Sequence, residues 1–465
     1  MPSDSVIVHR LFAPLALIGD AFRTDVTISI DAGGDIVAVE SGRAEGCEAV
    51  RGPVIPGMAN VHSHAFQRAM VGLTQRAGPG ADDFWTWREV MYRFVAAVEP
   101  EDVEAIAAGL CLDMLKSGFT TVGEFHYLHN APDGGAYADT AEMSERIVAA
   151  AGSAGMALTL LPALYQHGGF GGGPLHEGQR RFALDTGAYL RLVETLAARH
   201  GSDPNVSIGV APHSLRAVGP EALREAIAGV AALSPDAPVH IHAAEQTREV
   251  EDCLAWSGAR PVAWLADHVG FDRRWCVIHS THTDPAEKQA LATAGAVVGL
   301  CPTTEADLGD GIFDLAGFEA AGGRFGIGTD SNVSASPAAE LRQLEWSQRL
   351  ATRRRLVAGR REGASIGTSL YTRALEGGAQ ALGRRTGAIA PGCRADLVVL
   401  DAGHPLLAGR RHEAILDTWI FATGINPVRD VMAGGRWVIR ERRHPREERI
   451  LAEFRGTMLR LSTGL

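Results

Sequence analysis

The chain has 465 residues, of which 46% are hydrophobic and 21% charged, a composition typical of a soluble globular enzyme. Its formal net charge of −11 argues against nucleic acid or an anionic membrane surface as the main partner, but local arginines would still allow a small anionic substrate. Six scattered cysteines without C-x-x-C spacing, no signal peptide and no apolar run near the roughly 20 residues of a membrane span predict a reduced, cytoplasmic protein.

Residues 1–52 alternate apolar and polar side chains around a Gly-Gly turn, a pattern that predicts a β-meander. From residue 53 onward, short apolar runs alternate with segments of helical period. Eight of these runs are predicted strands: PVIPGMANVH, FTTVGEFHY, MALTLLPAL, NVSIGVAPH, APVHIHAAE, RWCVIHS, AVVGLCP and RFGIGTD. Nearly continuous apolar strands alternating with helices indicate a parallel sheet buried on both faces, and eight repeats predict a distorted (β/α)₈ barrel of the TIM type.

After the eighth predicted strand the sequence is mostly helical to about residue 383. It then returns to strand and turn character in TGAIAPGCRADLVVLD and PVRDVMAGGRWVIRER. In the simplest arrangement, residues 1–52 and 384–465 together build one small β-sandwich-like domain, and residues 53–383 form the barrel beside it.

In such a barrel, functional residues lie at the carboxyl ends of the strands. Six predicted strand ends carry polar residues: His62 and His64 on the first, Tyr127 on the second, His213 on the fourth, His240 and His242 on the fifth, His279 on the sixth and Asp330 on the eighth. A single histidine on an apolar strand is more often a satisfied core residue. Agreement among six strand ends instead predicts a metal site.

Three histidines and one carboxylate suit Zn²⁺, with Fe²⁺ as the alternative, and leave a coordination position for water. His62, His64 and Asp330 are the straightforward ligands. The fifth strand offers both His240 and His242, which face the same way because side chains two residues apart share a face of a strand. We choose His242, because Glu245 then follows at the rim where a substrate would lie, and we interpret His240 as a barrel-interior or supporting imidazole.

The chain has two lysines, Lys116 and Lys288, and both fall in predicted helices. Neither could serve as a carboxylated lysine that bridges two metals from a middle strand of the barrel. We therefore expect one divalent metal per chain, with His279 free to hydrogen-bond the metal's water.

The segments PGMANVHSH, HIHAAE, VIHSTH and GIGTDSN, in this order, resemble the amidohydrolase superfamily within its mononuclear deaminase branch. The C-terminal segment APGCRADLVVLD is similar too, so the resemblance covers nearly the whole chain. A second set, HAFQRAM, WTWREVMY, GEFHYLH and APHSLRAV, resembles the N-formimidoyl-L-glutamate deiminase family of bacterial histidine degradation. That family releases ammonia and leaves N-formyl-L-glutamate.

The resemblance implies these substrate contacts: Gln67, Arg88, Tyr127, His213 and Arg216. A substrate with two carboxylates favours guanidinium partners, because arginine pairs with a carboxylate through two parallel hydrogen bonds. The expected mechanism is attack of metal-bound hydroxide on the formimidoyl carbon. Asp330 and His279 would orient the hydroxide and take its proton, and Glu245 would carry a proton to the leaving nitrogen.

Two other functions stay open at this point. One is deamination of guanine or a related ring, which would want aromatic stacking of the kind that Trp85 and Trp87 offer. The other is a non-catalytic scaffold protein on the same fold, although the complete ligand set argues against it. Apart from its substrate, the chain is expected to pair with a second copy of itself as a homodimer.

Overall fold

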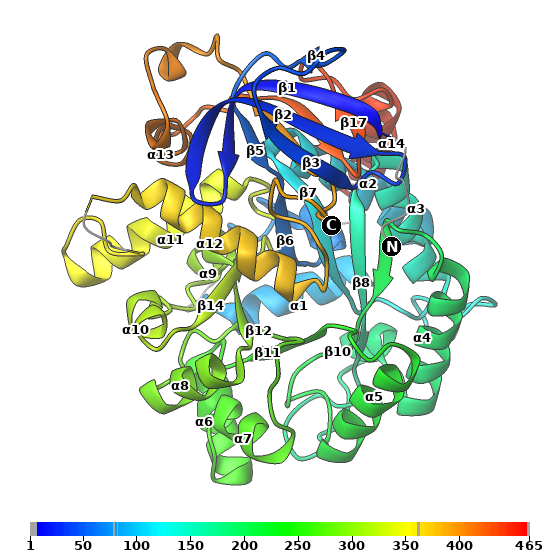
Figure 1. Ribbon diagram of the computed structural model, residues 1–465. Coiled ribbons are helices and arrows are strands. Elements are labelled where there is room, and N and C mark those ends of the chain that lie inside the picture. The colour runs from blue at the N-terminus through cyan, green and yellow to red at the C-terminus, as the bar shows by residue number, and fades with distance from the viewer. Residues whose placement is uncertain (1–6, 78–79, 81, 360–362, 463–465) are drawn as a thin grey trace.

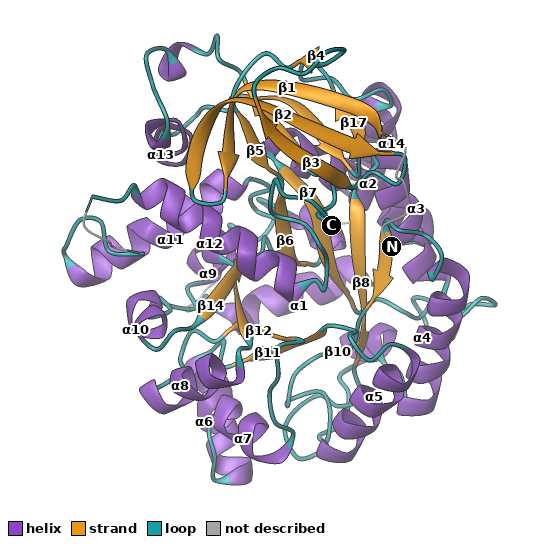
Figure 2. Cartoon of the chain, viewed as in Figure 1, coloured by secondary structure: helices purple, strands orange, loops and turns teal. Residues whose placement is uncertain are grey.

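Two sheets organise the chain, and each joins segments that are far apart in the sequence (Figure 1, Figure 2). The computed structural model describes residues 7–77, 80, 82–359 and 363–462. The first six residues of the predicted N-terminal segment and the last three of the predicted C-terminal segment lie outside this range. One sheet is a closed parallel barrel, and the other is a mixed sheet that lies above the barrel in the view of Figure 1.

The barrel has eight strand positions. Its strands are β6 (Met58–Ser63), β7 (Phe119–His126), β8 (Ala157–Leu164), β9 (Val206–Ile208), β10 (Ala211–Pro212), β11 (Val239–Ala243), β12 (Trp275–His279), β13 (Val297–Leu300) and β14 (Arg324–Ile327). β9 and β10 pair with successive parts of β8 and share the fourth position. The order is β10-β8-β7-β6-β14-β13-β12-β11, and parallel bridges from Val210 to Val239 and from Ser214 to His242 close the ring. The predicted (β/α)₈ barrel is confirmed.

The first predicted barrel strand, residues 53–62, is in fact two strands that belong to different sheets. β5 (Val54–Pro56) pairs in the mixed sheet, and β6 opens the barrel. Gly57 lies between them, where a Cβ atom would come within 2.3 Å of the Thr120 Cγ2 atom on β7. The apolar run continues across the junction because both strands are buried, so hydrophobic periodicity could not reveal the change of sheet.

Helices cover the outside of the barrel, as the purple ribbons of Figure 2 show. α2 (Pro100–Ser117) illustrates how the sequence determines where these helices begin and end. Proline opens the helix, and the Asp102 side chain accepts a hydrogen bond from the Glu99 backbone N–H at 2.8 Å, which satisfies a free donor of the first turn. Gly118 ends it at a φ of +106°, a left-handed conformation that favours glycine, and β7 begins at the next residue.

The other helices lie mostly between successive barrel strands or beside the mixed sheet. They are α1 (Phe84–Val95), α3 (Glu142–Ala154), α4 (Thr186–His200), α5 (Pro220–Leu233), α6 (Thr247–Ser257), α7 (Pro261–His268), α8 (Pro285–Ala294), α9 (Pro302–Leu308), α10 (Leu315–Ala320), α11 (Pro337–Thr352), α12 (Ile366–Ala381), α13 (Glu413–Phe421) and α14 (Glu447–Ser462), with three short 3₁₀ helices at Ala65–Met70, Glu177–Phe182 and Pro405–Leu407.

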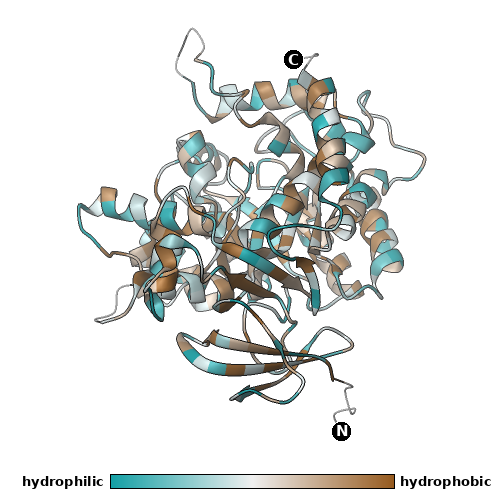
Figure 3. Cartoon of the chain, turned by 90° about the horizontal axis from the view of Figure 1, so that it is seen from above, coloured by the Kyte–Doolittle hydropathy of each residue, from teal (hydrophilic) through white to brown (hydrophobic). Residues whose placement is uncertain are grey.

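The mixed sheet joins the two ends of the chain. Its strands are β1 (Ile7–Ile18), β2 (Ala21–Asp31), β3 (Ile36–Ser41), β4 (Glu48–Ala49), β5, β15 (Leu397–Leu400), β16 (Val428–Ala433) and β17 (Arg436–Ile439), in the order β17-β16-β15-β5-β1-β2-β3 with β4 beside β1. One hydrophobic cluster contains Ile28 from β2 and Leu397 from β15, so both ends share a core. In Figure 3 the N-terminal strands alternate brown and teal, as expected for a sheet with one buried face.

None of the described helices is long and apolar enough to cross a membrane. The six cysteines are free, and four of them are buried. The cytoplasmic location, the homodimer and the domain boundaries after residues 52 and 383 stay predictions.

Candidate metal centre

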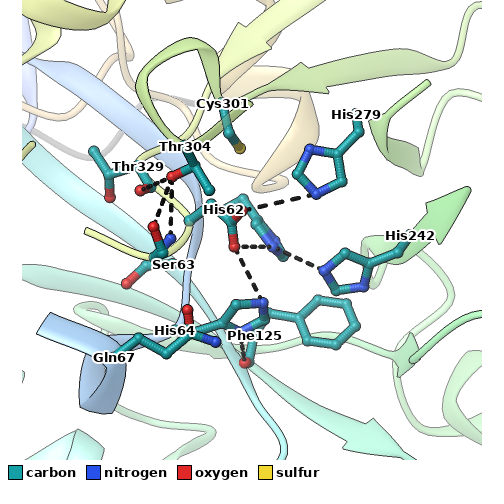
Figure 4. A network of polar contacts seen from close by, with 12 residues as sticks. His62, Ser63, His64, Gln67, Phe125, His242, His279, Cys301, Thr304 and Thr329 are labelled. Carbon is teal, nitrogen blue, oxygen red and sulfur yellow. Dashed lines mark hydrogen bonds and ion pairs between the residues drawn. The ribbon is translucent and has the colours of Figure 1, made fainter. Parts of the chain in front are cut away.

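Four histidines and one aspartate meet at the carboxyl end of the barrel. His62 comes from β6 and His64 directly follows it, His242 comes from β11 and His279 from the end of β12, and Asp330 follows β14; Figure 4 labels the four histidines. The Nε2 atoms of His62 and His242 are 3.1 Å apart. The Asp330 Oδ1 atom lies 3.5 Å from His62 Nε2 and 3.3 Å from His64 Nε2. The structure thus brings together residues that are separated by up to 268 positions in the sequence.

Backbone carbonyls orient two of these imidazoles. The Nδ1 atom of His64 donates to the Phe125 carbonyl at 2.8 Å, and that of His242 donates to the His213 carbonyl at 3.0 Å. Because a carbonyl can only accept, each Nδ1 carries the proton and each Nε2 keeps its lone pair. His62, His64 and His242 each offer one ring nitrogen, and these three atoms lie within 4.8 Å of one another. Metal-binding histidines are held in this way in proteins.

The charge states also suit a cation. Burial lowers the pKa of His62 to about 3 and lowers the pKa values of His64 and His242, so these imidazoles are neutral near pH 7. Burial alone would raise the pKa of Asp330, but the hydrogen bond with His62 and the neighbouring imidazoles lower it well below its usual range. The cluster therefore presents neutral nitrogen donors and one carboxylate, a donor set that fits Zn²⁺ or Fe²⁺.

His240 lies on the same strand as His242 but outside this cluster. Its Nε2 atom donates to the Ala381 carbonyl at 2.7 Å, and burial lowers its pKa to about 4. It is therefore a neutral imidazole with a backbone partner inside the barrel.

The turn after β14 holds Asp330 in an unusual backbone conformation. Asp330 and Asn332 have φ values of +46° and +61°, which non-glycine residues rarely adopt. The Asn332 side-chain amide donates to the carbonyls of Asp330 at 2.9 Å and His64 at 3.0 Å. This amide ties the turn to the end of β6, so the strain is offset by contacts that fix the carboxylate against the histidines.

A second set of charges lies beside the cluster. The His279 Nε2 atom is 3.7 Å from Glu245 Oε1 and 3.8 Å from Asp330 Oδ2. Burial by itself lowers the pKa of His279, but Glu245, Glu305 and Asp330 raise it to about 10. On the far side of Glu245, an Nη atom of Arg216 lies 3.6 Å from Oε2. Burial raises the pKa of Glu245, which suits a group that both takes and gives a proton.

The cluster opens into a cavity of about 570 Å³. The residues predicted to contact the substrate all line it: Gln67, Arg88, Tyr127, His213 and Arg216. Several aromatic side chains complete its wall: Phe84, Trp85, Trp87, Tyr92, Tyr165, Phe182 and Trp256. A cavity of this size, with apolar walls and a few converging polar groups, is typical of a small-molecule site.

Hydrogen bonds hold the polar lining in place. The Gln67 amide donates to the Tyr127 hydroxyl at 2.7 Å. The Arg88 Nε atom donates to the Tyr92 hydroxyl at 2.9 Å, and its guanidinium lies 5.2 Å from the ring centroid of Trp85. These contacts leave the guanidinium of Arg88 without a carboxylate partner in any described ion pair, so its charge is available to a ligand.

Sequence reasoning missed three charged residues near the cavity. Arg248 lines it and lies over Trp85, with its guanidinium 4.7 Å from the ring centroid. Glu305, on α9, faces the His279 Nδ1 atom at 3.3 Å, and Asp310 follows the same helix. The position of PTTEADLGD directly after the seventh predicted strand was the signal that could have pointed to Glu305 and Asp310.

Both lysines form ion pairs with carboxylates outside the histidine cluster. Lys116 pairs with Glu447 at 2.5 Å, and Lys288 pairs with Asp314 at 2.5 Å. Neither side chain lines the cavity.

Comparison with known proteins places the chain in a family. The family described as Amidohydrolase family matches residues 54–438. The chain belongs to the amidohydrolase family. This amidohydrolase is 47% identical in sequence to a crystal structure of an amidohydrolase from Brucella melitensis, with a TM-score of 0.91 over 97% of this chain and 99% of that one.

Two curated relatives come from Pseudomonas aeruginosa. The amidohydrolase is 52% identical to a formimidoylglutamate deiminase over 448 residues, which cover 96% of this chain and 98% of the relative. It is 31% identical to an 8-oxoguanine deaminase over 432 residues, which cover 88% and 90% of the two chains.

Proposed function

We propose that this amidohydrolase hydrolyses N-formimidoyl-L-glutamate to N-formyl-L-glutamate and ammonia, a step of histidine degradation. The observation that carries the proposal is the 52% identity with a formimidoylglutamate deiminase over nearly the whole of both chains. The cavity supports it, because Arg88 and Arg216 are among the arginines that line the same space as the histidine cluster. A substrate with one formimidoyl group and two carboxylates would use both features.

The proposed metal ligands are His62, His64, His242 and Asp330, holding one Zn²⁺ per chain, with Fe²⁺ as the alternative. Their converging lone pairs and single carboxylate support this assignment. When bound, such a cation lowers the pKa of a water molecule and so supplies a nucleophile near neutral pH.

The proposed substrate contacts are the lining residues Gln67, Arg88, Tyr127, His213 and Arg216. The two guanidinium groups would each bind one substrate carboxylate, because an ion pair inside a partly dry cavity is stronger than one in water. The Tyr127 ring lies 4.8 Å from the His64 ring and 5.7 Å from the His213 ring, and Gln67 bonds its hydroxyl, so these three side chains line the cavity beside the histidine cluster and can orient the substrate.

Proton movements are assigned to three residues. Asp330 and His279 would orient the attacking water, since their side chains lie 3.8 Å apart, and Asp330 could accept its proton directly. Because the raised pKa of His279 leaves that ring protonated near neutral pH, His279 would accept the water's proton only after passing its own to Glu245. Glu245 would then pass a proton to the departing nitrogen, so that neutral ammonia leaves. Its position 3.7 Å from His279 supports this role.

Ring deamination is the main competing function, because the chain is 31% identical to an 8-oxoguanine deaminase. The aromatic wall with Trp85 and Trp87 would suit a ring. Arg88 and Arg216 argue against it, since a neutral ring offers their charges no counterion.

The deciding experiment incubates purified protein with N-formimidoyl-L-glutamate and identifies products by NMR. N-Formyl-L-glutamate with ammonia is the expected outcome. Glutamate with formamide would mean that the other C–N bond breaks, and turnover of 8-oxoguanine in place of the formimidoyl compound would favour the ring deaminase. No turnover of either by protein with bound metal would favour the scaffold.

A further inference from the structure

A second group of potential metal ligands lies next to the proposed one. Glu245, His279 and Asp310 offer ligand atoms within 4.8 Å of one another. Their side chains come from the ends of β11 and β12 and from the turn after α9. The three residues are 4%, 1% and 4% exposed. None of them is among the four proposed metal ligands.

Two atoms of this trio lack hydrogen-bond partners among the described residues. They are His279 Nε2 and Asp310 Oδ2, and both are buried. Burying a polar atom without a partner costs about 1–3 kcal/mol, so natural structures seldom leave one without a ligand or water. The other nitrogen of His279 faces Glu305, which leaves Nε2 directed toward Glu245.

Hydrogen bonds fix the backbone of the third proposed ligand, Asp310, and one of its carboxylate oxygens. Its backbone N–H donates to the Glu305 carbonyl at 2.9 Å, and its carbonyl accepts from His282 Nε2 at 2.8 Å. The Gln246 amide donates to its Oδ1 atom. Oδ2 is therefore the carboxylate oxygen left for a ligand.

The two carboxyl groups of the trio, Glu245 and Asp310, favour a cation. Burial, and next the charge of Glu245, raise the pKa of Asp310. Two carboxyl groups in one dry space repel each other when both are ionised, and a cation between them removes that repulsion. A cation here would have to displace the proton of His279, whose pKa is raised to about 10. Two carboxylate oxygens and one imidazole nitrogen then form a set that suits Zn²⁺.

We propose that Glu245, His279 and Asp310 form a second divalent-cation site that binds weakly and inhibits the enzyme when Zn²⁺ is in excess. Binding is weak because an Nη atom of Arg216 lies 3.6 Å from Glu245 Oε2 and repels a cation. A cation on this site occupies Glu245 and His279, the groups assigned to proton transfer. This inhibition rests on the proposed function, whereas binding of the second cation does not.

Equilibrium dialysis tests the site without any activity measurement. Protein that keeps one ion after desalting is dialysed against rising concentrations of Zn²⁺, and metal per chain is measured by elemental analysis. A second equivalent should bind reversibly. Asp310→Asn should weaken the second equivalent by at least about tenfold and leave the first unchanged. His279→Gln, which removes the nitrogen donor, should weaken it as well.

The matched control is Asp307→Asn on α9, the helix that precedes Asp310. It removes an exposed carboxylate whose hydrogen-bond partner is Gln75. It should bind the second ion as the unmodified protein does. The proposal is overturned if no second equivalent binds, or if Asp310→Asn binds it unchanged.

Activity provides the second readout. Zn²⁺ beyond one equivalent should inhibit turnover of N-formimidoyl-L-glutamate, and Asp310→Asn should need at least about tenfold more Zn²⁺ for the same inhibition. Binding of a second ion without inhibition would overturn the inhibitory role. Binding by a protein that has no deiminase activity at any Zn²⁺ concentration would support the site and contradict the proposed function.

Discussion

At Arg216 a full positive charge lies inside the protein with incomplete pairing. Its side chain is 12% exposed, and its Nε atom has no hydrogen-bond partner among the described residues. Its contact with Glu245, at 3.6 Å, is too long for a hydrogen bond. A buried guanidinium in this state gains more from an incoming carboxylate than a solvated one does, which is the physical case for a substrate contact.

Replacement of Arg216 by Met should therefore impair recognition of the substrate. A substrate carboxylate left buried without its partner costs roughly 2–5 kcal/mol. The ratio kcat/KM should then fall about 30-fold to several thousand-fold. Exposed Arg224 on α5 provides the control, since Arg224→Met should leave kcat/KM unchanged. An analogue that lacks the carboxylate should lose far less with Arg216→Met, and normal turnover of the native substrate would refute the assignment.

Replacement of Glu245 by Gln separates proton transfer from metal binding. Glutamine keeps the size of the side chain but cannot take and pass on a proton. The variant should keep its metal, show a KM within a few-fold of normal, and lose about 10²–10⁴-fold in kcat. Steady-state kinetics with elemental analysis on the same sample checks this, and a near-normal kcat would remove the proton carrier from the mechanism.

The two histidines of β11 provide a matched pair for the metal assignment. His242→Ala should lower the metal content, because it removes a nitrogen whose orientation is fixed by the His213 carbonyl. His240→Ala should keep the metal, because that ring bonds the Ala381 carbonyl instead. Elemental analysis after desalting is the measurement, and the reverse pattern would show that His240 is the ligand.

Residues on strand ends could be predicted from the barrel pattern, whereas Arg88, on α1, came only from the family resemblance, and Glu305, on α9, was missed. His62, His64 and Asp330 follow apolar runs, so their convergence follows from barrel geometry alone. Asp310 lies in the turn after α9 and reaches the same region through tertiary packing, whereas the sequence GDG there has the pattern of an ordinary turn. Glu305 has the pattern of a helical residue, and its contact with His279 depends on tertiary packing.

At the scale of elements, the parallel strands were predictable because burial on both faces makes each a short apolar run. The junction between β5 and β6 was not predictable, because a single apolar run contains strands of two different sheets. The residue between the two strands is glycine because its backbone packs closely against its neighbours. The Gly57 N–H donates to the Asp396 carbonyl at 2.8 Å, and no room is left for a side chain against Thr120. The hydrophobic pattern indicates that a strand is buried, but it does not indicate to which sheet the strand belongs.

A side chain at this junction should destabilise the fold. In Gly57→Ala the new Cβ would lie 2.3 and 2.4 Å from the two outer atoms of the Thr120 side chain, an overpacking that costs about 1–3 kcal/mol. Urea unfolding should show a lower midpoint. Thr120→Ala removes the two nearest atoms but leaves the Thr120 Cβ at 2.9 Å, so the double variant should recover part of the loss. Additive effects of the two substitutions would show that the clash is relieved elsewhere.

At the scale of the whole molecule, the proposed metal ligands connect distant parts of the barrel. His62 lies on β6 and His64 directly after it, His242 on β11, and Asp330 after β14. A cation bound to the folded chain alone stabilises it by about 2.7 kcal/mol when present at 100 times its Kd. Removal by a chelator should therefore abolish activity and lower the midpoint of thermal unfolding, and about one equivalent of Zn²⁺ should restore both. Two tightly bound ions per active chain would contradict the proposed single metal.

The mixed sheet has a consequence for synthesis of the protein. β5 pairs with β15, although roughly 340 residues separate them in the chain. At about 5–20 residues per second, a ribosome needs about 15–70 s to make that interval. During this time β1 and β2 have emerged, but the strand that covers the other edge of β5 does not yet exist. The nascent chain must keep an open strand edge from pairing elsewhere until the final part is translated. The sheet whose synthesis begins first is therefore the last to be completed.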